Sequence, residues 1–167
     1  LGAAFYQPAW AGGYGTSNPV FLPPFQVQEF AEIKTGSSPD NSFQLITELI
    51  GDARREIRLS AYMLRSPGIV EALELAARRG VSVTILLDGW TVGRPLVQKI
   101  DPLELYLARR IVQAGGRVYY LRSNAGPRTD RRFRYLHSKY LVVDDQLFLS
   151  SENFANSGFS PNATIGS

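Results

Sequence analysis

The sequence predicts an α/β fold, in which a mainly parallel central sheet is flanked by helices. Two observations lead to this prediction. Short apolar runs alternate along the chain with segments whose apolar residues recur every three or four positions, which is the pattern of strands alternating with helices. Prolines precede two of the helical segments, and glycines follow them. Because a helix between two strands usually joins parallel neighbours, the alternation indicates a parallel sheet.

Two regions of the chain differ in composition. Residues 1–35 are rich in glycine, proline and aromatic residues, and we expect an N-terminal arm there with one short strand at Gln26–Ile33. The aromatic side chains of the arm either pack across the domain or form an interface. Residues 36–167 carry the alternating pattern and form the one predicted domain.

The first helix of the domain is predicted at Ser42–Arg55, because Phe43, Ile46 and Ile50 share one face after a turn-forming segment. Proline suits the first turn of a helix, and glycine suits the position after its last turn. These signals place the remaining elements in the following order: strand Ile57–Leu64, helix Pro67–Arg79 closed by Gly80, strand Val81–Leu87, helix Pro102–Ala114, strand Arg117–Leu121, and an antiparallel pair at His137–Val143 and Leu147–Leu149.

Composition excludes several kinds of site. The 167 residues include no cysteine and one histidine, so disulfides, thiolate metal sites and histidine clusters are excluded, and we expect neither a metal nor another cofactor. A net charge of +3 suits a substrate that carries phosphate. No apolar run reaches about 18 residues, so no transmembrane segment is expected.

Location is weakly indicated by the sequence. The start at Leu1, without a basic segment before Lys34, indicates a trimmed beginning. The lack of cysteine and the sequon at 162–164 slightly favour an extracytoplasmic or membrane-peripheral protein, and leave the location open.

The most specific signal is the run from His137 to Asp144, which places an imidazole, an ammonium and a carboxylate at His137, Lys139 and Asp144. Alternate side chains of a strand share a face, so His137 and Lys139 should point the same way. A neutral imidazole is nucleophilic near neutral pH, and an ammonium stabilises charge on phosphoryl oxygens. The pair therefore indicates attack on a phosphodiester.

This run resembles the H-x-K-x4-D motif of the phospholipase D superfamily. The segment Ser150-Ser151-Glu152-Asn153 is similar to the G-S-x-N segment of that family, with serine in place of glycine and a spacing one residue shorter. The resemblance covers about residues 42–159 and implies the phospholipase D-like sandwich.

The resemblance also indicates what is missing. Members of the superfamily usually carry a further carboxylate about ten residues past the asparagine, which orients the nucleophilic imidazole. None of the residues from 154 to 167 is acidic. We therefore expect the chain to be a single-motif half of a two-motif protein, incomplete at its C-terminus.

The resemblance implies a role for each motif residue. His137 attacks phosphorus and becomes a phosphohistidine, or acts as the general acid, while Lys139 contacts a non-bridging oxygen. Ser151 and Asn153 bind the substrate phosphate, with Ser151 supporting Asn153 by a hydrogen bond. Asn153 can also cap a helix that starts near residue 154. Asp144 completes the catalytic motif, but strict alternation points it away from His137, so we expect it to fix the adjoining loop.

Other residues are candidates for the surroundings of the site. Glu152 could replace the missing orienting carboxylate, although a solvent-facing position is the better expectation. Arg131, Arg132 and Arg134 precede the histidine and either form a wall of the substrate cleft or belong to a solvated loop. Three more candidates follow the second strand of the domain, where α/β sheets tend to place ligands: Asp88, Trp90 and Arg94.

The predicted function is that of a metal-independent phosphodiesterase that works through a covalent phosphohistidine. The expected reaction is hydrolysis or transfer on phospholipid headgroups, and cleavage of nucleic acid is the alternative. A catalytically silent phosphate-binding module is a third reading, because Ser150 and the missing carboxylate depart from the family pattern. Since the chain supplies one histidine, we expect activity only from a homodimer or together with a second motif.

Overall fold

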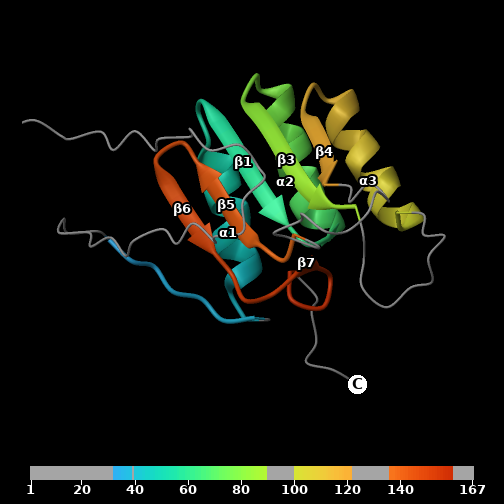
Figure 1. The fold of residues 1–167 in the computed structure, drawn as a ribbon. Helices are drawn as coiled ribbons and strands as arrows, with labels where there is room; N and C mark the ends of the chain where they lie inside the picture. The colour runs from blue at the N-terminus through green and yellow to red at the C-terminus, as the bar shows by residue number, and fades with distance from the viewer. Residues whose placement is uncertain (1–31, 39, 90–99, 122–135, 160–167) are drawn as a thin grey trace, which may run out of the picture.

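The computed structural model describes residues 32–38, 40–89, 100–121 and 136–159, and Figure 1 shows their arrangement. The helices are α1 (Ser42–Asp52), α2 (Pro67–Arg78) and α3 (Pro102–Gln113). The strands are β1 (Glu56–Ala61), β2 (Leu64–Arg65), β3 (Ser82–Asp88), β4 (Arg117–Leu121), β5 (Lys139–Val143), β6 (Gln146–Leu149) and β7 (Phe154–Ala155).

Five strands form the main sheet in the order β4-β3-β1-β5-β6. β1, β3 and β4 run parallel to one another, whereas β5 pairs antiparallel with β1, and β6 antiparallel with β5. The short strands β2 and β7 form a second, parallel pair. β1, the first strand in sequence, is therefore the central strand of the sheet, and later strands lie on both of its sides.

α2 and α3 begin where side chains accept backbone N–H groups of the first turn. The Ser66 hydroxyl accepts the Ile69 N–H at the start of α2, and Asp101 accepts the Leu103 N–H at 2.9 Å at the start of α3. Gly80, with φ at 91°, turns the chain from α2 towards β3 in a conformation that glycine adopts without strain.

The core lies between the sheet and the three described helices, which stand behind the sheet in Figure 1. Alternate residues of the strands face these helices, so that Ile57, Leu59 and Ala61 of β1 are buried while Arg58 is exposed. The largest fully buried core side chains are Ile46, Ile50, Ile57, Leu64, Ile69, Leu73, Ile85, Leu87, Leu107, Ile111, Phe154 and Phe159.

The predicted fold class is confirmed, with a parallel centre and the antiparallel β5–β6 pair beside it. The predicted strand Ile57–Leu64 is wrong as one element, because the chain leaves the main sheet after Ala61. Leu64 then pairs with Phe154, in the second sheet. No helix starts near Phe154, since Phe154 and Ala155 form β7.

Two further boundaries differ from the expectation. The first helix ends at Asp52 rather than Arg55, because the N–H groups of Arg54 and Arg55 bond to the Asp144 carboxylate. β5 begins at Lys139, so His137 lies just before the strand. Most of the predicted strand Gln26–Ile33, like most of the N-terminal arm, lies outside the described residues.

Membrane-spanning helices were also sought. Within the described ranges, no helix is both long enough and apolar enough to cross a membrane.

Candidate active site

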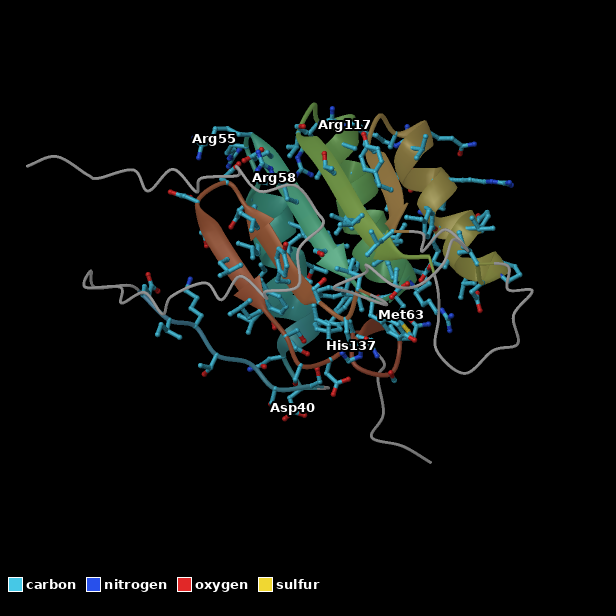
Figure 2. The ribbon with its side chains drawn as sticks, in the orientation of Figure 1. Asp40, Arg55, Arg58, Met63, Arg117 and His137 are labelled. Carbon is cyan, nitrogen blue, oxygen red and sulfur yellow. The ribbon has the colours of Figure 1, made fainter. Side chains whose placement is uncertain are left out.

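His137 and Lys139 lie at one edge of the main sheet. Because β1, β3 and β4 are parallel, their carboxyl ends share this edge, and the antiparallel β5 starts there. Ala61 at the end of β1 is opposite Lys139 at the start of β5. Figure 2 shows His137 at this edge near Met63, with Arg55, Arg58 and Arg117 at the opposite edge. This is the edge at which ligands usually bind to α/β sheets.

His137 and Lys139 are in direct contact. The Lys139 ammonium nitrogen lies 3.2 Å from Nε2 and 3.4 Å from Nδ1 of the His137 ring. The same ammonium lies 3.3 Å from the His137 carbonyl oxygen and donates to it. His137 is exposed and Lys139 is half-buried. The arrangement presents a nucleophilic ring and a cation to a ligand on the surface.

Tyr62 completes this pair from the end of β1. Its ring centroid lies 5.0 Å from that of His137 in an edge-on arrangement, and 6.0 Å from the Lys139 ammonium. Such contacts restrict the ring of His137 and favour a cation nearby. Tyr62 is not among the site residues predicted from the sequence. The strand predicted at Ile57–Leu64 placed Tyr62 inside a strand, whereas β1 ends at Ala61 and Tyr62 follows it.

The backbone around His137 is also fixed. The Ser138 carbonyl accepts the Tyr62 N–H at 3.0 Å, and the Ser138 and Ser60 hydroxyls lie 2.7 Å apart. Asp88 is 3 % exposed and accepts the Leu136 N–H at 2.7 Å. Asp88 is therefore covered by the chain, and the hypothesis that it forms a substrate wall is wrong.

The segment around Asn153 lies near the same edge. Asn153 precedes Phe154, which pairs with Leu64, two residues after Tyr62. The side-chain oxygen of Asn153 is buried and accepts no hydrogen bond from a described residue.

The turn before Asn153 is organised by Ser150 rather than Ser151. The Ser150 hydroxyl accepts the Glu152 N–H at 2.9 Å, whereas Ser151 is exposed, and no hydrogen bond links it to the buried Asn153 oxygen within the described ranges. Glu152 is exposed and lies against Gly158. A solvent-facing role for Glu152 is therefore favoured over orientation of His137.

Asp144 lies at the other end of β5, away from His137. Its carboxylate accepts the N–H groups of Arg54, Arg55 and Glu56, each at 2.9 Å. These hydrogen bonds, led by the one from Glu56, hold the pKa of Asp144 below its usual value. The structure therefore does not bring Asp144 to His137, and the contacts of Asp144 are those expected of a loop-fixing residue. Its catalytic grouping with His137 stays a prediction.

The arginines proposed for the substrate wall, Arg131, Arg132 and Arg134, lie outside the described residues, as do Trp90 and Arg94. Their part in the site stays a prediction.

The Glu104 carboxylate, which was also not predicted from the sequence, supports the backbone near this edge of the sheet. The buried Glu104 of α3 accepts the Leu64 N–H at 3.0 Å and so holds the start of β2. Burial raises the pKa of Glu104, and the nearby Asp101 and Asp88 act in the same direction. Burial, with a smaller effect of Glu104, raises the pKa of Tyr120 to about 12.

In the described part of the chain, no three or more histidine, cysteine, aspartate or glutamate side chains are grouped so that they could hold a metal ion.

Comparison with protein families and solved structures identifies relatives of this chain. A family model described as "Cardiolipin synthase, PLD-like domain" matches residues 46–166. This match spans both the His137–Lys139 pair and the Asn153 segment. None of the curated proteins compared with the chain matches it significantly.

The solved structures similar to the chain include Nuc and NucT. Nuc from Salmonella typhimurium, a phospholipase D family member, is 28% identical, with a TM-score of 0.57 over 76% of this chain and 74% of Nuc. NucT from Helicobacter pylori is 21% identical, with a TM-score of 0.53 over 71% of this chain and 70% of NucT. The second likeness concerns the fold alone.

The contacts of Asp144 predict a pH-dependent contribution to stability. A carboxylate whose pKa is lowered by folding stabilises the fold above its unfolded pKa, and this stabilisation is lost as the pH falls through the folded value. Asp144→Asn, which tolerates the positive φ of 53°, should therefore lower the midpoint of urea unfolding at pH 7, and the difference from the wild type should shrink towards pH 3.

Asp145→Asn is the matched control, because this neighbouring carboxylate is exposed. Its unfolding midpoint should stay close to that of the wild type. Equal midpoints for Asp144→Asn and the wild type at pH 7 would show that the negative charge of Asp144 and its hydrogen bond to the Arg54 N–H do not stabilise the fold.

Proposed function

The chain belongs to the family of phospholipase D-like domains, and we propose that it cleaves or transfers phosphodiesters, without a metal, through a covalent phosphohistidine at His137. The contact of the Lys139 ammonium with both ring nitrogens of an exposed His137 is the observation that carries this proposal. Nucleophile and cation are already side by side, as phosphoryl transfer requires.

In the first step, a ring nitrogen of His137 attacks phosphorus, and the bond from phosphorus to the leaving oxygen breaks. Lys139 stabilises the charge on the non-bridging oxygens. The leaving oxygen takes a proton from a general acid on the opposite side of phosphorus. In the second step, that same group accepts a proton from water or an alcohol, which attacks the phosphohistidine and releases the ring.

The general acid must come from outside the motif described here. His137 is the only histidine of the chain, and it is used as the nucleophile. We propose that a second histidine is supplied by another copy of the chain or by a second motif. A two-fold dimer would bring two equivalent edges together and so supply both roles.

Phospholipid headgroups are the substrate class that we propose first, for hydrolysis or for transfer. The family description, which names a cardiolipin synthase, supports a lipid substrate. The likeness to Nuc, a phospholipase D family member at 28% identity, supports an enzyme rather than a binding module. The arginine-rich sequence before His137 supports nucleic acid as the second candidate substrate.

His137→Ala should abolish hydrolysis of bis(p-nitrophenyl) phosphate. Loss of the nucleophile should exceed the roughly hundred- to ten-thousand-fold loss of rate that accompanies loss of an acid or base. Release of p-nitrophenol measures the rate, and circular dichroism should show an unchanged fold because the side chain is exposed.

Gln146→Ala serves as the control for this experiment, since Gln146 is exposed at the far end of β5 and β6. It should keep the wild-type rate. Turnover retained by His137→Ala would exclude the phosphohistidine, and a folded wild-type dimer without turnover would support the silent phosphate-binding module instead.

Removal of metals should leave the rate unchanged. The ligands that would hold a transition metal are absent from the composition, and Lys139 supplies positive charge instead. The hydrolysis rate is measured before and after dialysis against EDTA. A rate that falls on chelation and returns with a divalent ion would contradict the metal-independent mechanism.

The substrate class is tested with Arg131, Arg132 and Arg134 all changed to alanine. For nucleic acid, the log–log salt slope of binding to single-stranded DNA should flatten by about 0.7 to 0.9 for each phosphate contact that is lost. For phospholipid, adsorption to anionic vesicles should weaken by about 1 kcal/mol per charge instead. No change in either assay would mean that these arginines form a solvated loop.

A further inference from the structure

Asp88 is a buried carboxylate that reaches from β3 to the segment carrying His137. It is the last residue of β3 and is 3 % exposed. One of its oxygens accepts the Leu136 N–H at 2.7 Å, across 48 positions of sequence. A charged acceptor makes this hydrogen bond stronger than a bond between neutral groups. Leu136 directly precedes His137, the proposed nucleophile.

The sheet register explains how this contact spans two strands. Ala61 at the end of β1 is opposite Leu87 of β3 on one side and opposite Lys139 of β5 on the other. Asp88 therefore lies one position beyond the end of β1, near the segment of chain that enters β5. Neighbouring strands are about 4.8 Å apart, so a side chain and a short turn of backbone together cover the gap.

His137 is consequently held from both sides. Asp88 fixes the peptide N–H of Leu136, and the Tyr62 N–H fixes the carbonyl of Ser138 at 3.0 Å. His137 is the one residue between Leu136 and Ser138, whose backbone groups are fixed in this way. The Tyr62 ring then restricts the imidazole itself.

We propose that Asp88 is a positioning residue for the nucleophile. Its carboxylate sets the backbone from which the imidazole projects, and so does part of what the family's downstream carboxylate does for the ring. This inference rests on the proposed role of His137, since Asp88 touches neither substrate nor the reacting atoms. A displacement of about 1 Å at a reacting group lowers a rate by as much as a hundredfold.

The test compares Asp88→Asn with Asp88→Leu. The amide oxygen of asparagine can still accept the Leu136 N–H, whereas leucine has a similar volume and no acceptor. For bis(p-nitrophenyl) phosphate hydrolysis, Asp88→Leu should lower kcat by about 10- to 100-fold with KM changed less than about threefold, and Asp88→Asn should stay within about fivefold of the wild type.

A second measurement does not depend on turnover. His137 is the one histidine, so its imidazole gives a single set of NMR signals. These signals should move in Asp88→Leu and stay in place in Asp88→Asn. The amide proton of Leu136 should exchange slowly in the wild type and rapidly in Asp88→Leu.

Asp144→Ala is the matched control, because it removes another carboxylate that accepts backbone N–H groups, at the opposite edge of the sheet. It should lower stability and leave the His137 signals unchanged. Imidazole signals and kcat that are the same in Asp88→Leu as in the wild type would overturn the positioning role and leave the proposed function intact. If Asp88→Leu does not fold, rapid exchange of Leu136 in the wild type, or displaced imidazole signals in Asp88→Asn, would overturn it equally.

Discussion

The antiparallel pairing of β5 with β1 decides where the reactive groups of this domain lie. The parallel strands β1, β3 and β4 bring their carboxyl ends to one edge, and only a strand that runs the other way can bring its amino end to the same edge. β5 does so, and His137 and Lys139 arrive beside Tyr62 and Asp88, which leave β1 and β3 there. A parallel β5 would have carried the histidine to the far edge, where the exposed arginines lie in Figure 2.

Carboxylates that accept backbone N–H groups hold the irregular segments around this sheet. Asp144 accepts three consecutive N–H groups at the start of β1, Glu104 accepts one at the start of β2, and Asp88 accepts one at the entry to β5. Backbone groups that leave a sheet or helix need partners, and a charged acceptor satisfies them more strongly than a neutral one. The same kind of interaction therefore serves stability at one edge and the arrangement of the site at the other.

The sequence predicted the elements that have strong periodicity and the residues that are adjacent in sequence. Apolar spacing located all three described helices and the main strands, and the two-residue offset of His137 and Lys139 predicted their contact. Contacts between distant segments were not predictable in this way. Nothing local shows that Tyr62 meets His137, or that Glu104 holds Leu64 and interrupts a strand that reads as continuous. The motif pattern also grouped Asp144 with a site from which the length of β5 separates it.

His137 combines a fixed backbone with an exposed imidazole, which suits a site shared with a second copy of the chain or a second motif. The neighbouring backbone is anchored at Leu136 and Ser138, and yet the imidazole is exposed beside a half-buried cation. Ordering a flexible catalytic loop at the moment of association would cost conformational entropy, and anchors made within the domain remove that cost beforehand. A second histidine, whether from another copy or from a second motif, would then need only to be placed opposite a nucleophile that is already in position. Each copy or motif would then hold its own histidine through contacts within its own domain. Catalysis, as we propose it, would need both histidines together.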